Sequence, residues 1–169
     1  MFEKRIVARE LAISHLKNLP DDLLPSLGLS YLVRFYQYIY SSSLEKIIIH
    51  KSATCVITYN VETLWRRVII NTLPSFLCAI GSKLLDRQFR QYLWGCNKHC
   101  NFSPQIAFMF SDEKRAGHGS ELLSQLSLSP LYVKTLQGGR AEQFYKKNGF
   151  TEIDFFEYAK RKYTLLIRV

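Results

Sequence analysis

The sequence predicts a mixed α/β fold in one domain, with a central sheet of about six to seven strands and helices on both faces. Two β-branched runs, 45–50 and 53–59, are separated by two residues and indicate a β-hairpin. Residues 105–169 follow the order strand, helix, strand, helix, strand, strand. The length of 169 residues suits one hydrophobic core.

The residues before the hairpin are expected to be mainly helical. Residues 2–8 predict a short strand, and 9–19 have the apolar spacing of a helix. A short helical turn is expected at 23–27, and a strongly aromatic helix at 30–41.

The hairpin is followed by a second helical region, 61–95, which Pro74 divides into two expected helices. A polar connection, 97–104, leads into the C-terminal elements. These are a strand at 105–111, a helix at 120–127, a strand at 131–136, a helix at 141–147, and two closing strands at 150–158 and 163–169.

The composition is that of a folded, basic protein. Hydrophobic residues make up 47% and aromatic residues 14%, which excludes a disordered chain. The formal charge of +9 comes from 23 basic and 14 acidic residues and favours phosphate-bearing ligands or anionic lipid. Nucleic acid is not an expected partner, because the basic residues are scattered and no nucleic-acid motif is present.

The cysteines and the N-terminus favour a cytoplasmic protein. The four cysteines have no disulfide-like spacing, and no basic then apolar leader follows Met1. No apolar run is long enough to span a bilayer. Cys96 and Cys100 lack a matching second pair of metal ligands, so we expect no metal.

The strand at 105–111 and the turn after it are typical of an anion site. Ile106, Phe108 and Phe110 alternate with Ala107, Met109 and Ser111, as in a mostly buried strand. Two glycines then permit close approach of the backbone before the next helix, whose N–H groups favour phosphate. The turn consists of Lys114, Arg115, Ala116, Gly117, His118, Gly119 and Ser120.

The arrangement of these motifs resembles the GNAT superfamily of N-acetyltransferases. The likeness is strongest in 104–169, where the turn is followed by Val-Lys-Thr at 133–135 and by Ala-x-x-Phe-Tyr-Lys-Lys-Asn-Gly-Phe at 141–150. The N-terminal part of the chain also resembles bacterial members with small-molecule or sugar acceptors. The residues that carry this likeness are His15 with Pro20, Leu-Gly at 27–28 and Phe-Tyr at 35–36.

The resemblance implies acetyl-CoA as cosubstrate, bound where two parallel strands splay apart. Main-chain groups of Met109, Phe110 and Ser111 would pair with the pantetheine arm, and residues 114–120 would cradle the pyrophosphate. Tyr145 would be the general acid that protonates the coenzyme A thiolate. The alternative for Tyr145 is an aromatic residue that only packs beside Phe144.

Three positions depart from the family pattern. The basic residue expected three positions before the first glycine is Lys114, and Arg115 stands two before it. Gly138 replaces an Asn, and Gln105 replaces a Glu that often serves as general base. The general base is therefore not identified by the resemblance.

The acceptor side is expected in the N-terminal third of the chain. His15 is the first candidate for the base, with a surface or packing role as its alternative. Arg34 and Tyr36 are candidates for acceptor binding, and an ordinary amphipathic core helix is their alternative. The resemblance implies direct transfer in a ternary complex to a small amine, with an amino sugar or nucleotide sugar as the leading acceptor. A protein or peptide N-acetyltransferase and a non-catalytic acyl-CoA-binding module remain alternatives.

The predicted organisation has three parts: acceptor-side helices and hairpin in 1–60, a helical insertion in 61–100, and the acetyl-CoA-binding core in 101–169. The insertion is basic and amphipathic. It is expected to pack on the sheet, with weak association with anionic membrane as its alternative. A monomer and a homodimer are both compatible with the sequence.

Overall fold

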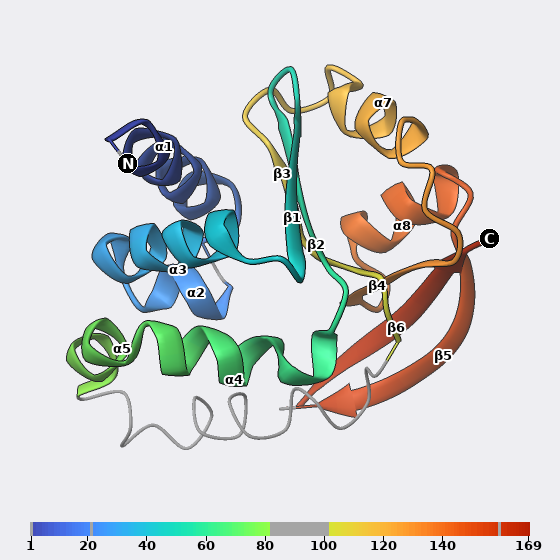
Figure 1. Ribbon diagram of the computed structural model, residues 1–169. Coiled ribbons are helices and arrows are strands. Elements are labelled where there is room, and N and C mark those ends of the chain that lie inside the picture. The colour runs from blue at the N-terminus through green and yellow to red at the C-terminus, as the bar shows by residue number, and fades with distance from the viewer. Residues whose placement is uncertain (1, 21, 82–101, 159) are drawn as a thin grey trace.

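The computed structural model describes residues 2–20, 22–81, 102–158 and 160–169 (Figure 1). The helices are α1 (Phe2–Asn18), α2 (Leu23–Ser26), α3 (Leu29–Ser41), α4 (Val61–Asn71), α5 (Leu73–Ile80), α7 (His118–Ser124) and α8 (Arg140–Lys147). The strands are β1 (Glu45–His50), β2 (Ala53–Thr58), β3 (Gln105–Ser111), β4 (Leu131–Leu136), β5 (Thr151–Tyr158) and β6 (Arg161–Arg168).

The six described strands form one mixed sheet in the order β1-β2-β3-β4-β6-β5. All neighbours pair antiparallel except β3 and β4, which are parallel. Helices α1, α2 and α3 lie on one face, and α7 and α8 on the other (Figure 1). The predicted mixed α/β sheet with helices on both faces and a parallel strand pair is therefore confirmed.

The expected strand at 2–8 is wrong, because α1 is one helix from Phe2 to Asn18. Ala8, Leu11, Ala12 and His15 are buried at successive helical positions and pack towards α3 and the sheet. His15 is the polar member of this otherwise apolar buried stripe. The helix therefore continues through a segment whose apolar residues also suited a strand.

Each face of the sheet has its own hydrophobic core. The larger core joins α1, α3, α4 and α5 to one face and includes the fully buried rings of Tyr31, Phe35 and Tyr36. The smaller core joins α7 and α8 to the other face around Leu122, Leu123 and Tyr145. Strand β2 is buried along its whole length because both cores cover it.

A β-bulge on β3 interrupts the expected alternation of this strand. Ile57 pairs with Ile106 while Val56 pairs with Phe108, so Ala107 is the extra residue. As a result, Ile106 packs in the smaller core, whereas Phe108 and Phe110 pack in the larger one. The alternation predicted that Ile106, Phe108 and Phe110 face the same side of the sheet. This prediction is wrong, because the bulge turns Ile106 to the opposite face from the other two.

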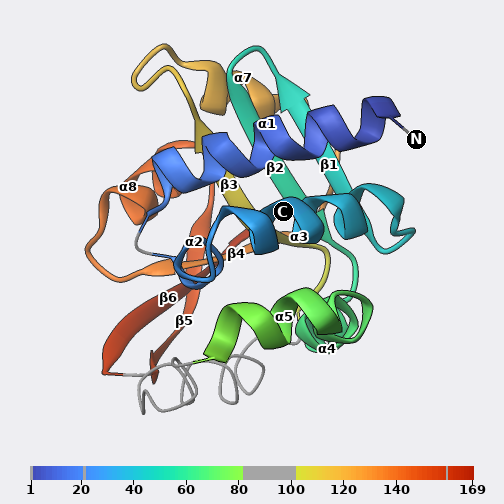
Figure 2. The same ribbon diagram turned by 90° about the vertical axis from the view of Figure 1, so that its left-hand side faces the viewer.

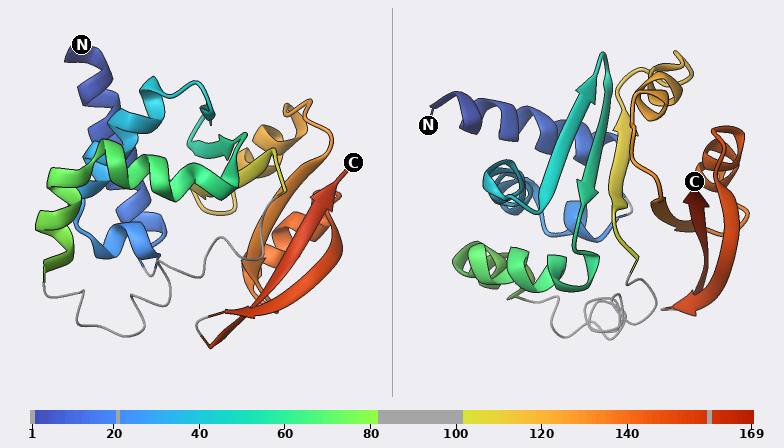
Figure 3. Two further views of the ribbon diagram at one scale, coloured as in Figure 1. Left: turned by 60° about the horizontal axis from the view of Figure 1, so that its bottom comes forward. Right: turned by 45° about the vertical axis from the view of Figure 1, so that its right-hand side comes forward.

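The parallel pair β3–β4 diverges at the same place. Its register contains only Gln105 with Tyr132 and Ile106 with Val133, although both strands continue further. The right-hand view of Figure 3 shows β4, β6 and β5 turning away from the first three strands. A bulge bends the strand that carries it, so the position of Ala107 accounts for the splay.

The expected division of 61–95 at Pro74 is confirmed as far as the structure describes it. Asn60 caps α4 by accepting a hydrogen bond from Thr63 N–H at 3.2 Å, and Pro74 lies in the first turn of α5. Residues 82–101 lie outside the described part of the chain, as do the predictions for Cys96 and Cys100. None of the described helices is long and apolar enough to cross a membrane.

Candidate active site

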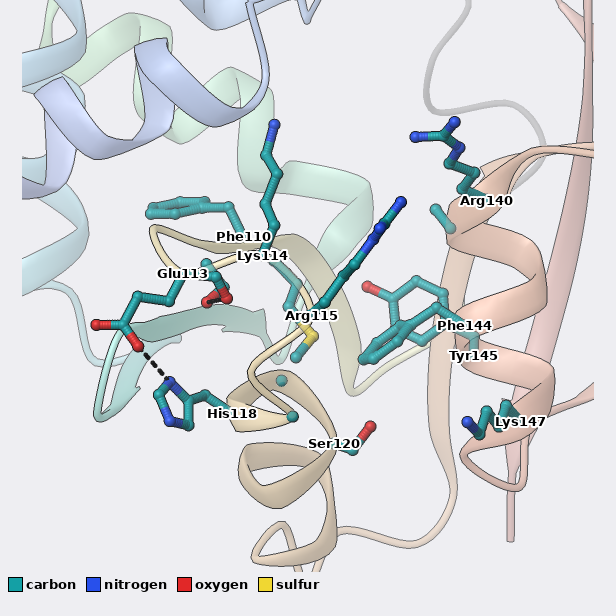
Figure 4. Close-up of a pocket in the computed structure, with 15 residues that line it drawn as sticks. Phe110, Glu113, Lys114, Arg115, His118, Ser120, Arg140, Phe144, Tyr145 and Lys147 are labelled. Carbon is teal, nitrogen blue, oxygen red and sulfur yellow. Dashed lines mark hydrogen bonds and ion pairs between the residues drawn. The ribbon is translucent and has the colours of Figure 1, made fainter.

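The turn between β3 and α7 opens into a cleft of about 590 Å³. Its walls come from the end of β3, the glycine turn and α8 (Figure 4). The lining residues are Met109, Phe110, Ser111, Glu113, Lys114, Arg115, Gly117, His118, Gly119, Ser120, Arg140, Ala141, Phe144, Tyr145 and Lys147. The structure thus brings together all residues predicted to contact acetyl-CoA except Ala116, which is exposed on the turn.

The two glycines of the turn serve different purposes. Gly117 has a φ of +83°, a backbone conformation that a side chain would strain. Gly119 has an ordinary φ, but a Cβ atom there would lie 3.2 Å from Cζ of Phe144 and 3.4 Å from Cε of Met109. Gly119 therefore allows α7 and α8 to approach each other across the cleft.

The charges around the cleft are mainly positive. Lys114, Arg115, Arg140 and Lys147 line it together with one carboxylate, Glu113. Figure 4 shows Arg115 extending from the turn towards α8. The cleft therefore combines cations with an apolar wall, which fits a ligand with phosphate groups and an uncharged arm.

The tip of the β1–β2 hairpin supports the turn, a role that the sequence did not indicate. Ser52 Oγ lies 2.7 Å from Nδ1 of His118 and 3.0 Å from Oγ of Ser111. The main-chain carbonyl of Ser52 accepts a hydrogen bond of 3.0 Å from Asp112 N–H. One hairpin residue is thus bonded to the end of β3, just before the predicted pyrophosphate turn, and to His118 within that turn.

A second contact joins the hairpin to the first turn of α7. Lys51 Nζ and His50 Nε2 lie 2.6 and 2.9 Å from the same Glu121 oxygen. These hydrogen bonds, from Lys51 first and then His50, lower the pKa of Glu121 to about 2. Glu121 therefore stays ionised and holds the hairpin tip against α7.

Asp112 joins α1 to the end of β3. Its carboxylate accepts hydrogen bonds of 2.8 Å from Ser14 Oγ and from Asn18 Nδ2, and Lys17 Nζ lies 3.8 Å away. This side chain therefore fixes the helix that carries His15 relative to the turn.

The turn before α8 is closed by a carboxylate on the helix itself. Gly138, which has a φ of +73°, donates its N–H to the buried Glu142, and Glu142 also pairs with Lys146 at 2.5 Å. The hydrogen bonds from Lys146 and Gly138 lower the pKa of Glu142. Gly138 thus lies in a hydrogen-bonded turn. It occupies the position at which the N-acetyltransferase family that the sequence resembles usually has an Asn.

Tyr145 lies on the inner side of α8, where the residue is 6% exposed. Its ring centroid is 5.3 Å from those of Phe144 and Phe150, and Figure 4 shows its hydroxyl directed into the cleft. Burial raises the pKa of Tyr145, with a smaller contribution from the nearby Cys55. The phenol therefore stays protonated at neutral pH and can donate its proton.

A second, smaller cavity of about 290 Å³ lies beside β3 and β4, next to the end of α1 and the start of α2. Figure 2 shows these two helices in front of this part of the sheet. The lining residues are Leu19, Asp22, Ile106, Ala107, Phe108, Met109, Val133, Lys134, Thr135, Leu136, Gly139, Arg140, Ala141 and Tyr145. Both cavities share Tyr145, Met109, Arg140 and Ala141, so they meet where the strands diverge.

His15, Tyr36 and Arg34, the predicted acceptor residues, do not line either cavity. His15 is fully buried with its Nδ1 2.7 Å from the Tyr36 hydroxyl, while its Nε2 has no hydrogen-bond partner among the described residues. Burial lowers the pKa of His15 to about 4. Arg34 is exposed and donates to Gln37 on the same helix at 3.4 Å.

The sequence did not single out Asp22, Lys134, Arg140 or Ser52, which the structure places at the cavities or at the turn. Lys134 belongs to the Val-Lys-Thr motif, but nothing in the sequence connects it with Asp22, which lies far away along the chain. Only the folded chain places both residues at the smaller cavity. Among the described residues no group of three or more His, Cys, Asp or Glu side chains could hold a metal ion.

Comparison with solved structures identifies the fold. A crystal structure of an acetyltransferase superposes with a TM-score of 0.60 at 14% identity, covering 97% of this chain and 95% of that one. The crystal structure of an N-acetyltransferase from Staphylococcus aureus Mu50 superposes with a TM-score of 0.51 at 16% identity, covering 98% and 95%. No protein-family model and no curated protein matches the sequence. The chain therefore has the fold of these acetyltransferases.

Proposed function

We propose that this protein is an acetyl-CoA-dependent N-acetyltransferase that transfers the acetyl group directly to a small amine. The observation that supports this most is the meeting of two cavities at Tyr145, where β3 and β4 diverge. One cavity is large and cationic, and the other is small. Such an arrangement lets two ligands approach each other through the sheet.

The larger cleft has the groups that coenzyme A requires. After Ile106, the edge of β3 that faces β4 has no partner in the strand register, so main-chain groups near Met109–Ser111 can pair with the amides of an extended arm. Lys114 and Arg115 stand beside the turn that would cradle the pyrophosphate. Phe144 supplies the apolar wall.

Tyr145 is the proposed general acid. In the forward reaction the amine nitrogen forms a bond with the acetyl carbonyl carbon, and the bond between that carbon and sulfur breaks. The Tyr145 hydroxyl gives its proton to the leaving sulfur, and the phenolate recovers a proton from the new amide nitrogen. The raised pKa of Tyr145 keeps its hydroxyl protonated before the transfer.

The described cysteines favour direct transfer over an acylated enzyme. Cys55 is completely buried on β2, and burial raises its pKa to about 12. A neutral buried thiol is a poor nucleophile. Cys78 is exposed on α5 and lines neither cavity.

Calorimetry with acetyl-CoA, coenzyme A and ATP tests the proposal. We expect acetyl-CoA and coenzyme A to bind with dissociation constants at or below about tens of micromolar, since most cosubstrate KM values lie between 1 μM and 1 mM. ATP should bind at least about tenfold more weakly, because it lacks the arm that pairs with β3. Equal affinity for ATP would reduce the cleft to a general phosphate site.

Turnover distinguishes the other two functions. Release of coenzyme A thiol with peptides but with no small amine would indicate a protein N-acetyltransferase. Tight binding of acetyl-CoA without turnover of any amine or peptide would indicate a non-catalytic acyl-CoA-binding module.

A further inference from the structure

We propose that the acceptor is a small apolar amine that enters the smaller cavity as its uncharged free base. This inference rests on the proposed function, because it names the class of the second substrate of the same site. Three observations support it: the carbon lining of the smaller cavity, the interactions in which its charged side chains already take part, and the lack of a general base on its walls.

The lining of the smaller cavity is mainly carbon. Side chains without nitrogen or oxygen reach it from the end of α1 and from both diverging strands; they include Leu19, Ile106, Phe108, Met109, Val133 and Leu136. Leu136, at the end of β4, is 43% exposed. A ligand in the cavity would remove part of this apolar surface from water, and an apolar ligand gains the most from doing so.

The size of the smaller cavity limits the length of the acceptor. Its volume of about 290 Å³ lies just below the range of roughly 300–1,000 Å³ that holds drug-sized ligands. The ends of α1 and α2 stand in front of this part of the sheet (Figure 2). An alkyl or benzyl amine therefore suits the cavity better than a folded protein surface.

The charged and titratable side chains of the smaller cavity offer little to an ammonium. They are Asp22, Lys134, Arg140 and Tyr145. Lys134 Nζ lies 5.4 Å from the centroid of the Tyr163 ring, and Asp22 also interacts with another part of the protein. Arg140 carries a positive charge, which repels a second cation. An ammonium in this cavity would therefore lose its water without gaining an uncommitted negative partner.

No described residue on the walls of the smaller cavity is suited to remove a proton from an ammonium. None of them is a histidine or a glutamate, and the aspartate already has a partner. His15 lies outside both cavities, and Gln105 stands where the family that the sequence resembles often has a Glu. An apolar environment disfavours the charged form of an amine, so the cavity itself selects the free base.

The reaction of a free base balances without a further base. The neutral nitrogen forms a bond with the acetyl carbon, the carbon–sulfur bond breaks, and Tyr145 gives its proton to the sulfur. The proton that the nitrogen then loses returns to the Tyr145 phenolate. An uncharged amine and acetyl-CoA thus give an amide and the coenzyme A thiol.

The first test compares amines that share one carbon chain. Pentylamine, 5-aminopentanol, 5-aminovalerate and cadaverine end in a methyl, a hydroxyl, a carboxylate and an ammonium group. With saturating acetyl-CoA, initial rates of thiol release should give kcat/KM at least about tenfold higher for pentylamine than for the other three or for glucosamine. Each methylene added between propylamine and pentylamine should raise kcat/KM by about two- to fourfold.

The second test separates binding of the free base from removal of a proton by the enzyme. Propylamine and 3,3,3-trifluoropropylamine have the same carbon chain, and the fluorine atoms make the second amine less basic. For each amine, kcat/KM should rise with pH and level off near the pKa of that amine, so the rise should come at lower pH for the fluorinated amine. A decline of kcat/KM above the pKa of the amine would overturn binding of the free base.

Two variants locate the effect in the smaller cavity. Leu136→Asn should lower kcat/KM for pentylamine by about fivefold or more, with the affinity for acetyl-CoA unchanged, because it replaces carbon surface by an amide. Leu44→Asn is the matched control, since Leu44 is 38% exposed and lines neither cavity. Lys134→Met should change the preference for pentylamine over 5-aminovalerate by less than about threefold. Equal losses in Leu136→Asn and Leu44→Asn would overturn the role of Leu136, and a preference lost in Lys134→Met would overturn the role of the carbon lining.

The outcomes separate this inference from the proposed function. Calorimetric binding of acetyl-CoA together with equal or faster turnover of the hydroxyl, carboxylate or ammonium amine would overturn the inference and leave the acetyltransferase assignment standing. Binding of acetyl-CoA with no turnover of any of these amines would also overturn the inference and leave the cosubstrate assignment standing. Absence of acetyl-CoA binding would overturn both proposals.

Discussion

At the scale of single residues, Tyr145 has two separable properties. Its ring is part of the smaller core, between Phe144 and Phe150. The residue lines both cavities, and its hydroxyl points into the larger cleft. Phenylalanine would keep the first property and remove the second. The packing interpretation and the catalytic interpretation of this residue therefore make different predictions.

Tyr145→Phe should lower kcat by about 100-fold or more, because the proton donor to the leaving sulfur is lost. The affinity for acetyl-CoA should change little, as should the free energy of unfolding. Steady-state kinetics and calorimetry measure the two effects. Tyr132→Phe is the control, since Tyr132 stacks on Phe102 at 5.0 Å and lines neither cavity. Unchanged kcat in Tyr145→Phe would show that the residue only packs.

His15 illustrates a polar residue whose environment determines its protonation. Its ring lies within about van der Waals range of Phe108 and Phe110, with centroids 5.0 and 5.3 Å away, and it is completely buried. Its pKa is about 4 in the folded protein, against 6.5 for the unfolded chain. A neutral imidazole bonded to Tyr36 therefore belongs to the folded state.

Acid should therefore destabilise the protein through His15. Because the folded pKa is depressed, the unfolded chain binds the proton first as the pH falls below 6.5, and stability declines until the pH reaches about 4. The shift corresponds to about 3 kcal/mol at most. Urea unfolding at pH 7 and 4.5 should show this loss, and His15→Gln should flatten it.

His50→Gln is the matched control, because His50 lies at the hairpin tip and is partly exposed. The acid-dependent loss of stability should persist in this variant. An equally steep pH dependence in His15→Gln would mean that other groups cause the loss.

At the scale of elements, the β1–β2 hairpin is more than one edge of the sheet. Its tip residues 50–52 contact the pyrophosphate turn and the first turn of α7 through Ser111, His118 and Glu121. The hairpin itself was predictable from its β-branched runs. Its contact with a turn about 60 residues later was not, because that contact depends on the strand order of the sheet.

Ser52→Ala should weaken acetyl-CoA binding by about tenfold. The substitution removes the hydrogen-bonding group shared by Ser111 and His118, and each such bond contributes about 1 kcal/mol. Calorimetry checks the affinity, and thermal unfolding checks that the fold is retained. Ser41→Ala removes a hydroxyl that bonds only within α3 and should leave the affinity unchanged. Equal affinity of Ser52→Ala and the unaltered protein would limit the hairpin tip to a structural role.

The strand that carries the site shows where local pattern fails. Ile106, Phe108 and Phe110 have the spacing of one buried face, yet the bulge at Ala107 divides them between two cores. Both cores are apolar, so either side accepts these side chains. The alternation therefore predicted the strand correctly, but it predicted incorrectly which face of the sheet each of these side chains occupies.

At the scale of the whole molecule, the site lies where the two parts of the sheet separate. The β3–β4 register is short, so few main-chain bonds join β1-β2-β3 to β4-β6-β5 there. A ligand that contacts both β3 and α8 would add connections across this gap. Binding of acetyl-CoA to the folded protein, and not to the unfolded chain, should therefore raise the free energy of unfolding.

Acetyl-CoA at about 100 times its dissociation constant should stabilise the fold by about 2.7 kcal/mol. For a chain of this size the change corresponds to a rise in Tm of roughly 5–10 °C. Thermal unfolding with and without the ligand measures it, and ATP at the same concentration is the control. A matching rise with ATP would indicate that phosphate contacts alone are responsible.

The sequence by itself determined the class of fold, most of the elements, and the residues of the glycine turn and Tyr145 motif. These depend on local spacing, on residues that favour strands or helices, and on glycines that permit a particular backbone. Only the tertiary structure decided that the first helix begins at Phe2, that His15 is buried, and that Asp22 and Lys134 share a cavity. Those outcomes depend on which elements pack together, and residues more than 100 positions apart leave no local pattern of their contact.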